Sequence, residues 1–294
     1  MHRSPTLARR FFNRFEPVHA VTYFAPEARS ALDDLGYRGF WMGYFAARSA
    51  PFGVVPTELV VAAFYNFAPE RVAKALPAAW DIAPPATALR ARETAAVAAL
   101  RRYGVTDAEA AEAADLAAKA AAGADPGGRA LYAANRALDW PEEPLARLWH
   151  ATTLLREHRG DGHIAALLAE GISGRESNVL HAAAGRVPEE MIKRSRDYDD
   201  ALWEQHAGTL RRRGLLDEEG ALTQAGRALK QRIEDATDAL AVPALTVLDD
   251  DEVEALFRVL TPITRKVVAG GDIPVSTPMG LDRTDLGDDR AHLR

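Results

Sequence analysis

Apolar side chains recur at three- and four-residue steps along most of the chain, whereas runs that alternate apolar and polar residues are nearly absent. Ala, Leu, Arg and Glu dominate the composition, and this mixture favours helices. Segments rich in Gly and Pro interrupt the pattern and mark the expected helix ends. The pattern therefore predicts a mainly α protein. Helices are expected over residues 6–19, 27–35, 40–49, 56–66, 69–78, 86–103, 107–122, 127–138, 142–158, 163–170, 175–184, 188–213, 223–240 and 250–259.

One short β-hairpin is also predicted, near residues 215–223. Two leucines, Leu215 and Leu216, precede a polar turn, and Ala221 with Leu222 follow it. Thr223 is then placed to cap a helix whose apolar positions recur at helical spacing. A helix, a small hairpin wing and a closing helix are typical of a winged helix.

The chain contains a candidate internal repeat, because residues 38–72 can be laid on residues 161–191. In this alignment Gly39 falls on Gly162. We therefore predict tandem duplicated helical, winged-helix modules, with the one hairpin wing in the second module. The expected divisions are a first module over residues 1–122, a second over residues 123–265 and a tail over residues 266–294.

The stretch "EHRGDGH", residues 157–163, crowds carboxylates and histidines into seven positions. The repeat places His163 where the first copy has Phe40, at the start of a helix. Two glycines allow the backbone to turn there, and Asp161 can cap the helix that follows. A ligand or proton-transfer role for His163 stays open beside this structural interpretation. A metal site is not expected, because no HExxH or other zinc spacing occurs.

Long segments of the chain resemble an actinobacterial family of helix-turn-helix proteins. The similarity covers about residues 10–260 and includes "FEPVHAVTYF", "GYFAARSAPFG", "RGDGH" and "LRRRGLLDEEGALTQAGRALKQRIEDATD". This resemblance implies a fold and supplies no mechanism. The closing part also resembles the wing of MarR-type regulators, in which a helix-turn-helix reads DNA and a nearby cleft binds small aromatic or phenolic ligands.

Composition narrows the functional classes. The 294 residues and a hydrophobic content of 48% allow two domains with separate cores. The net charge of −6 provides no overall attraction to nucleic acid or to an anionic membrane. The chain has no cysteine, which excludes disulfides, thiolate catalysis and cysteine-ligated metals. No apolar run reaches the roughly 18 residues of a membrane span, so a cytoplasmic location is expected, without a cofactor and with a homodimer possible.

Double-stranded DNA is one candidate partner. The helix before the hairpin would read it, and the sequence places "VPEEMIKRSRDYDDALW", residues 187–203, there. Carboxylates lie among the basic residues of this helix and in the turn of the wing, which weakens the interpretation. The candidate DNA-binding residues are Lys193, Arg194, Arg196, Arg211, Arg212 and Arg213.

A small aromatic or anionic ligand is the other candidate partner. Residues of the first half recur at three- and four-residue steps, so they can share helix faces and line a pocket. The alternative is an amphipathic core with polar tips at the surface. The candidate ligand-binding residues are Glu16, His19, Tyr23, Trp41, Tyr44, Arg48, His163 and His181.

These patterns favour a winged-helix protein of regulator type, which binds DNA, a small ligand in a cleft between the repeated modules, or both. In the alternative, the scaffold has lost DNA binding and acts as a small-molecule-binding protein or as an enzyme of secondary metabolism. Motifs for serine hydrolases, nucleotide-binding loops, kinases and deaminases are absent. A histidine with a carboxylate can still perform acid–base chemistry, so enzyme activity stays open, tandem winged-helix glycosylases being one precedent.

Overall fold

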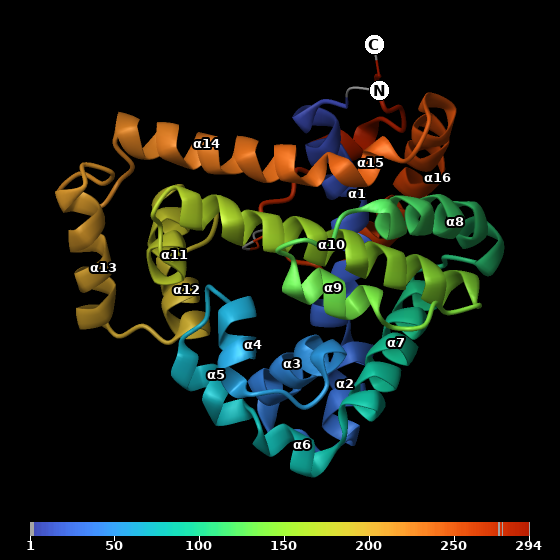
Figure 1. Ribbon diagram of the computed structural model, residues 1–294, viewed down its shortest axis with the longest axis horizontal. Coiled ribbons are helices and arrows are strands. Elements are labelled where there is room, and N and C mark those ends of the chain that lie inside the picture. The colour runs from blue at the N-terminus through green and yellow to red at the C-terminus, as the bar shows by residue number, and fades with distance from the viewer. Residues whose placement is uncertain (1–2, 276, 278, 294) are drawn as a thin grey trace.

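The computed structural model describes residues 3–275, 277 and 279–293, and these residues are mainly helical, as predicted (Figure 1). None of the described helices is both long and apolar enough to cross a membrane. The elements in chain order are α1 (Pro5–Phe24), α2 (Pro26–Asp34), α3 (Gly39–Ser49), η1 (Ala50–Phe52), α4 (Thr57–Ala63), α5 (Pro69–Ala75), α6 (Ala78–Ile82), α7 (Pro85–Arg102), α8 (Asp107–Gly123), α9 (Ala130–Arg136), α10 (Pro144–Ala169), α11 (Gly174–Ala183), α12 (Glu189–Arg196), α13 (Asp200–Arg212), α14 (Gln224–Ala241), α15 (Pro243–Thr246), α16 (Asp250–Ala269) and η2 (Thr284–Gly287).

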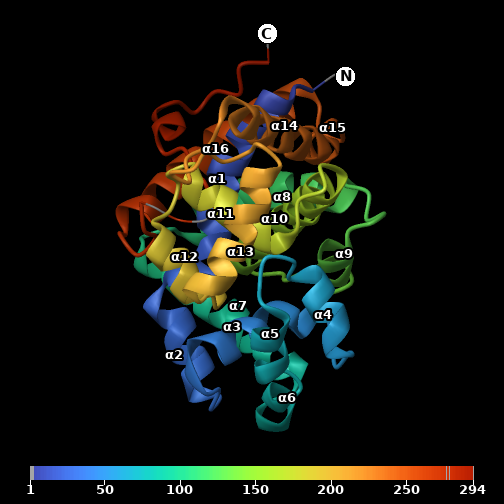
Figure 2. The same ribbon diagram turned by 90° about the vertical axis from the view of Figure 1, so that its left-hand side faces the viewer.

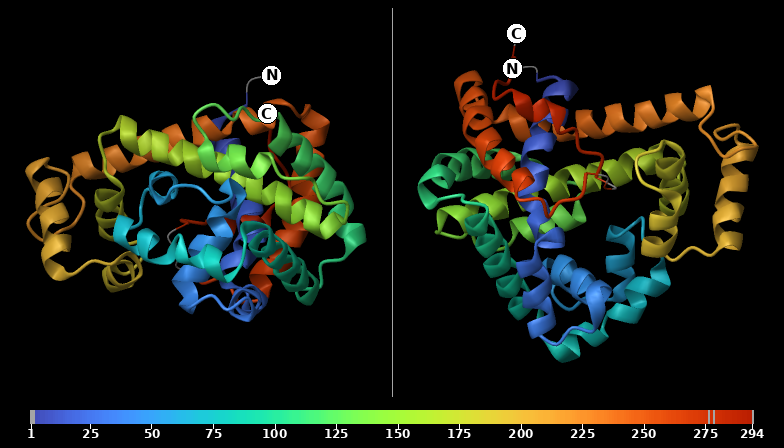
Figure 3. Two further views of the ribbon diagram at one scale, coloured as in Figure 1. Left: turned by 60° about the horizontal axis from the view of Figure 1, so that its bottom comes forward. Right: turned by 180° about the vertical axis from the view of Figure 1, so that it is seen from behind.

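A central bundle is formed by α1, α7, α8, α10 and α16, and α1 runs through its middle (Figure 3, right). Helix α8 presents a row of fully buried alanines, among them Ala113, Ala117 and Ala121, to its neighbours. These small side chains let α10 and α16 approach α8 closely. Larger side chains such as Trp149 and Phe257 fill the remaining space of this core.

A second hydrophobic cluster lies below the central bundle in Figure 1 and takes its side chains mainly from α3 to α6. Its centre is aromatic: the rings of Phe45 and Phe67 meet edge to face, 5.0 Å apart, and Phe64 stacks on Phe45 at 5.8 Å. Aromatic pairs of this geometry add about 0.5–1.5 kcal/mol each to the free energy of burial. This cluster holds α3 against the central bundle.

The third cluster is formed by α11, α12, α13, the start of α14 and the end of α10. Figure 1 shows α11, α12 and α13 together on the left of the molecule, and in Figure 2 they face the viewer. The single helix predicted over residues 188–213 is wrong, because the chain divides into α12 and α13. Asp197 adopts a left-handed φ of 54° and ends α12, and the Asp199 side chain accepts a hydrogen bond from the Leu202 amide at 2.7 Å to start α13.

The predicted hairpin is much reduced. Leu216 and Leu222 form one isolated antiparallel bridge, and the Asp217 amide donates to the Ala221 carbonyl at 2.9 Å. Across the described part of the chain no sheet forms, so a winged-helix wing is not confirmed. The predicted cap after it is confirmed, because Thr223 Oγ1 accepts from the Gly226 amide at 3.0 Å at the start of α14.

Helix α10 continues through the stretch "EHRGDGH", so the predicted boundary between two helices at Gly160 and Gly162 is wrong. Gly162 lies where α10 packs against α14: a Cβ there would be 2.7 Å from a guanidinium nitrogen of Arg129 and 3.3 Å from Leu240 Cβ. A glycine inside a helix costs about 1 kcal/mol relative to alanine. The sequence therefore carries a real breaker signal, which the close approach of the neighbouring elements overrides.

Asp161 does not cap the helix start predicted after it, but it accepts a hydrogen bond from the first turn of another helix. Asp161 lies inside α10, and its Oδ2 accepts a hydrogen bond from the Tyr132 amide at 2.9 Å, in the first turn of α9. Burial raises the pKa of Asp161 to about 6, partly opposed by this bond. Asp161 therefore joins α10 to α9 and does not start a helix of its own.

Tandem repetition is not confirmed. Gly39 is the first residue of α3, whereas Gly162, its expected counterpart, is interior to α10. Phe40 is 44% exposed, so the correspondence of His163 with a buried phenylalanine is not confirmed. The central core takes side chains from both sides of the expected boundary at residue 122, and the division into modules stays a prediction.

The described part of the tail packs on the central bundle. The Arg14 guanidinium, fully buried in α1, donates to Asp285 at 2.7 Å, and Arg10 donates to the same carboxylate at 2.9 Å. Ile273 and Ala291 are buried in the central core. This part of the tail is therefore a component of the fold.

Candidate functional site

The predicted ligand-binding residues of the first half come together where α1, α3 and α10 meet. The rings of Tyr23 on α1 and Tyr44 on α3 are 5.4 Å apart, and Trp41 contacts Tyr44 edge to face at 5.6 Å. Arginines and a carboxylate from α10 and α12 complete the group. We call it the arginine–tyrosine site, which consists of Glu16, His19, Tyr23, Trp41, Tyr44, Arg48, Arg156, Glu157 and Arg196.

A buried ion-pair network forms the floor of this site. Arg48 binds Glu157 in a bidentate manner, with Nε and Nη2 each 3.1 Å from a carboxylate oxygen. Arg156 Nη1 donates to the same carboxylate at 2.6 Å, and Arg48 Nη1 donates to the Tyr44 hydroxyl at 3.2 Å. Burial disfavours the Glu157 charge, but Arg156 and Arg48 outweigh it and lower its pKa. Glu157 therefore remains ionised and holds both guanidinium groups in place.

Glu16 is the second carboxylate of the network and is in a different state. It is 1% exposed, lies 3.8 Å from Arg156 Nε, and its Oε2 has no hydrogen-bond partner among the described residues. Burial raises the pKa of Glu16 from 4.5 to about 7, although Arg156 opposes the increase. The carboxyl group can thus exchange a proton near neutral pH, as a general acid or base does.

His19 and Tyr23 form a hydrogen-bonded pair one helical turn apart. His19 Nδ1 lies 3.0 Å from Thr153 Oγ1, and its Nε2 lies 2.9 Å from the Tyr23 hydroxyl. Thr153 already donates its proton to the Trp149 carbonyl at 2.9 Å, so it accepts from Nδ1–H. Burial, with Arg156, lowers the pKa of His19, and the neutral ring then presents Nε2 as an acceptor to Tyr23.

Arg196 occupies a position that the sequence did not predict. It was a candidate for DNA contact, yet its guanidinium lies over the rings of Phe67 at 4.2 Å and Trp41 at 5.9 Å. Burial lowers the pKa of Arg196 to about 10. The Arg48 charge adds to this decrease, whereas Tyr44 opposes it. Within the described residues no carboxylate forms an ion pair with Arg196, and its Nε has no partner. The DNA-facing role of Arg196 stays a prediction, and its place beside these rings does not favour it.

The aromatic side of the arginine–tyrosine site is not sealed. Phe40 stacks on Tyr44 with ring centres 6.0 Å apart and is 44% exposed. Tyr23, Trp41 and Tyr44 are partly buried. The guanidinium groups and hydroxyls therefore lie beside aromatic faces that keep some contact with solvent.

Sequence reasoning missed Arg156 and Thr153, and it noted Glu157 only as one of the carboxylates in "EHRGDGH". A signal was available, since Arg156 and Glu157 directly follow "LWHATTLL", a run without acidic or basic residues other than one histidine, in the same helix. Two adjacent charges on a buried helix need partners from other elements. Their partners came from α1 and α3, which local sequence cannot identify.

His163 and His181 lie outside the arginine–tyrosine site. His163 Nδ1 lies 2.9 Å from Thr237 Oγ1 on α14, and burial lowers the pKa of His163 to about 4. Burial lowers the pKa of His181 to about 3, with Lys230 adding to the decrease. Both rings are neutral at neutral pH and sit between α10, α11 and α14.

Helix α13 directly precedes the predicted hairpin and has the position of a reading helix. Its exposed side chains include Asp200 and Glu204, and the following turn exposes Glu218 and Glu219. Carboxylates in these places repel DNA phosphates.

Most of the basic candidates are held by partners inside the protein. Lys193 Nζ donates to Asp200 at 3.1 Å, and Arg211 pairs with Glu204. Arg213 donates to backbone carbonyls at the end of α10. The exposed members of the predicted set are Arg194, Arg212 and Arg213.

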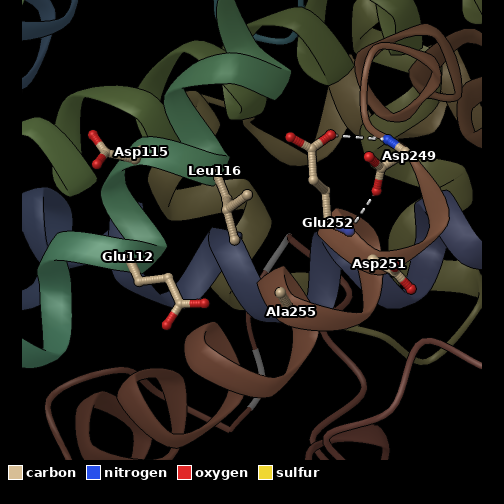
Figure 4. A pocket seen from close by; sticks show the side chains of 7 residues that line it. All are labelled: Glu112, Asp115, Leu116, Asp249, Asp251, Glu252 and Ala255. Atoms are coloured by element: carbon tan, nitrogen blue, oxygen red, sulfur yellow. Dashed lines mark hydrogen bonds between the residues drawn. The ribbon is translucent and has the colours of Figure 1, made fainter.

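A separate acidic surface lies between α8 and α16 (Figure 4). Its carboxylates have structural partners: Glu252 and Asp249 form a capping box, and Glu112 accepts from Arg258 at 3.1 Å. Within residues 3–275, 277 and 279–293, no three His, Asp or Glu side chains form a group that could hold a metal ion. This surface is explained by helix capping and ion pairing.

A family model described as a helix-turn-helix family matches residues 8–274. A match is found neither among curated proteins nor among solved structures. The family match confirms the helix-turn-helix resemblance, whereas the MarR-type similarity and the actinobacterial origin stay predictions. Because the match covers most of the chain, the protein belongs to this helix-turn-helix family.

Proposed function

We propose that the protein binds a small aromatic anion at the arginine–tyrosine site. The observation that carries the proposal is Arg196, a cation held among the rings of Trp41 and Phe67 without a carboxylate partner in the described chain. Arg196 is partly buried, and a guanidinium of this kind gains from an anionic partner that binds it directly.

The charge balance of the site supports an anionic ligand. Arg48, Arg156 and Arg196 contribute positive charge, whereas Glu157 is ionised and Glu16 has a pKa of about 7. The site therefore has a net positive charge even when both carboxylates are ionised. Two unit charges 4 Å apart interact by about 4 kcal/mol at an effective dielectric constant of about 20, so an anion placed here is strongly favoured over a neutral ligand.

The rings of the site support an aromatic ligand. Tyr44 accepts from Arg48 and keeps its own hydroxyl proton available to donate. Phe40, Trp41 and Tyr44 provide faces and edges against which a flat ring can pack. A phenolate or an aromatic carboxylate combines both requirements.

Sequence-specific DNA binding is the second candidate function, because the chain belongs to a helix-turn-helix family. The acidic exposed residues of α13 oppose it. Arg196 is the last residue of α12, and α13 begins a few residues later. If α13 contacts DNA, a ligand bound at Arg196 would change the position of α13 and thereby the affinity for DNA. The two functions together describe a ligand-responsive regulator, and the first without the second describes a binding protein.

The experiment is calorimetric titration with salicylate and 4-hydroxybenzoate, with benzyl alcohol as the neutral comparison. We expect the anions to bind, and Arg196→Met to weaken them by about ten- to a hundredfold, the effect of losing a charged hydrogen bond. Arg194→Met is the matched control, since Arg194 is exposed on the same helix. Binding that is absent, or equal in wild type and Arg196→Met, rejects the proposal.

A gel-shift assay with the gene's own upstream DNA at several salt concentrations tests the second candidate. Specific binding that weakens with salt, and that salicylate alters, indicates a regulator. Ligand binding without a DNA shift indicates a binding protein. Consumption of the ligand would identify an enzyme, for which Glu16 and the His19–Tyr23 pair supply proton-transfer groups.

A further inference from the structure

A cavity outside the arginine–tyrosine site is lined in part by Trp149 and His150. It has a volume of about 360 Å³ and lies between α7, the segment 138–141 and α10. Leu89, Leu138 and Trp140 supply part of its apolar lining. Ligand sites commonly occupy about 300–1,000 Å³, and an apolar cavity of roughly 150 Å³ already admits benzene. We call this space the Trp140 cavity.

Two buried side chains in the wall of the Trp140 cavity have unused hydrogen-bonding atoms. Arg92 is 6% exposed and donates through Nη1 to the Ala47 carbonyl at 3.0 Å and through Nη2 to Asn135 Oδ1 at 3.3 Å. Its Nε has no partner within the described residues. His150 is 3% exposed, and its Nε2 likewise lacks one. Buried polar atoms are satisfied in most proteins, so these two lack a partner that water or a bound ligand would supply.

The chemistry of these atoms defines the ligand. Arg92 Nε–H can only donate, and neutral His150 can donate through Nε2. Burial, with Arg92 and Arg147, lowers the pKa of His150 to about 3, so the ring carries no charge at neutral pH. Both atoms can therefore donate to an acceptor oxygen.

The lining also limits the charge and shape of the ligand. Arg90 and Arg92 are balanced by Glu93 and Asp139, so the wall has no net attraction for either sign of charge. The indole of Trp140 meets the His150 ring edge to face at 4.9 Å and offers an aromatic surface. A planar ring suits this surface.

We propose that the Trp140 cavity is a second binding site, for a planar aromatic compound that carries a carbonyl or carboxylate oxygen. The ring packs against Trp140 and Leu138, and the oxygen accepts a hydrogen bond from the side chain of Arg92 or of His150. The lining residues of the cavity, which include Arg92, Trp140 and His150, are distinct from those of the arginine–tyrosine site. The Trp149 ring lies parallel to that of His19 at 6.5 Å and donates to the His19 carbonyl at 3.4 Å.

The test is a titration of the full chain followed by tryptophan fluorescence and by calorimetry. The probes are benzamide and benzoate, which share the acceptor oxygen, and benzylamine, which lacks it. We expect saturable binding of benzamide, of benzoate or of both, and none of benzylamine. Binding of benzylamine alone, or of no probe, overturns the proposal.

Three variants test whether the probes bind in the Trp140 cavity. Ala86→Phe narrows the cavity, and Ala98→Phe is the matched control, since Ala98 is exposed on α7 outside the lining. His150→Phe retains a ring and removes the nitrogens. We expect Ala86→Phe and His150→Phe each to weaken binding by about tenfold or more, with Ala98→Phe unchanged.

The same titration separates this site from the proposed function. Arg196→Met should leave benzamide binding unchanged. If Arg196→Met abolishes it while Ala86→Phe does not, the probe occupies the arginine–tyrosine site and the Trp140 cavity proposal is overturned. If salicylate fails to bind at Arg196 while benzamide binding depends on Ala86 and His150, this inference holds and the proposed function fails.

Discussion

Replacing Glu16 by Gln removes a charge that the protein buries at a high free-energy cost. Glu16 is 1% exposed, and its nearest cation is the Arg156 guanidinium, 3.8 Å away. Gln has nearly the shape of the protonated acid and cannot ionise. The variant therefore isolates the contribution of the Glu16 charge to the free energy of unfolding.

The magnitude follows from the raised pKa of Glu16. Burial raises it from 4.5 to about 7, which corresponds to about 3 kcal/mol in favour of the protonated form. Below pH 4.5 the acid is protonated in both folded and unfolded states, so its charge has no effect on stability. As pH rises toward 7 the unfolded state ionises first, and the folded state becomes less stable by up to that amount.

The assay is urea unfolding of wild type and Glu16→Gln at several pH values between about 4.5 and 8. We expect nearly equal stability at the lowest pH, and a variant that is more stable by up to about 3 kcal/mol at pH 8. Other titrating groups cancel in the difference. A difference that is independent of pH, or that favours wild type as pH rises, would refute the reasoning.

Three further predictions concern other buried polar groups. Asp161→Ala should lower the free energy of unfolding by about 0.5–2 kcal/mol, because the Tyr132 amide loses its acceptor; an unchanged value in urea unfolding would contradict this. Arg48→Met should lower it by about 3–5 kcal/mol, since Glu157 loses a bidentate partner; thermal unfolding that stays at the wild-type temperature would disprove it. Burial lowers the pKa of His163 from 6.5 to about 4. The contribution of neutral His163 to the free energy of unfolding is therefore fully present above pH 6.5, and it is lost as pH falls toward 4 because the unfolded state is protonated first. His163→Gln should weaken that pH dependence, and equal acid sensitivity of the two proteins would count against it.

The sequence was sufficient to predict a mainly α protein and the face shared by Glu16, His19 and Tyr23. Such features depend on helical spacing within one element, and spacing is read directly from the chain. The cap at Thr223 was predicted for the same reason, because a threonine before an amphipathic run has few alternatives.

Features that depend on contacts between distant elements could not be predicted. The break expected at Gly162 fails because Arg129 and Leu240 approach α10 there, and neither is near in sequence. Arg196 was assigned to a DNA-facing surface by its place among basic residues. The end of α12 at Asp197 and the rings of Trp41 turn it toward the first half of the chain instead.

Some of the features that were predicted wrongly do have a recognisable signal in the sequence. Asp199 precedes an amphipathic run and could have been recognised as the cap that begins α13. The hairpin signal at Leu215 to Leu222 was correct in position but too short to form a sheet, since a single bridge joins the two sides. Its turn is polar, as expected, and the leucines are buried in the third cluster.

A crystal structure of the protein soaked with salicylate tests the central claim most directly. We predict density for the ring beside Trp41 and Tyr44, with the carboxylate within hydrogen-bonding distance of the Arg196 guanidinium. The same soak of Arg196→Met should show no density there. Salicylate bound only at other places, or bound equally in the variant, would contradict the assignment of the arginine–tyrosine site as the ligand-binding site.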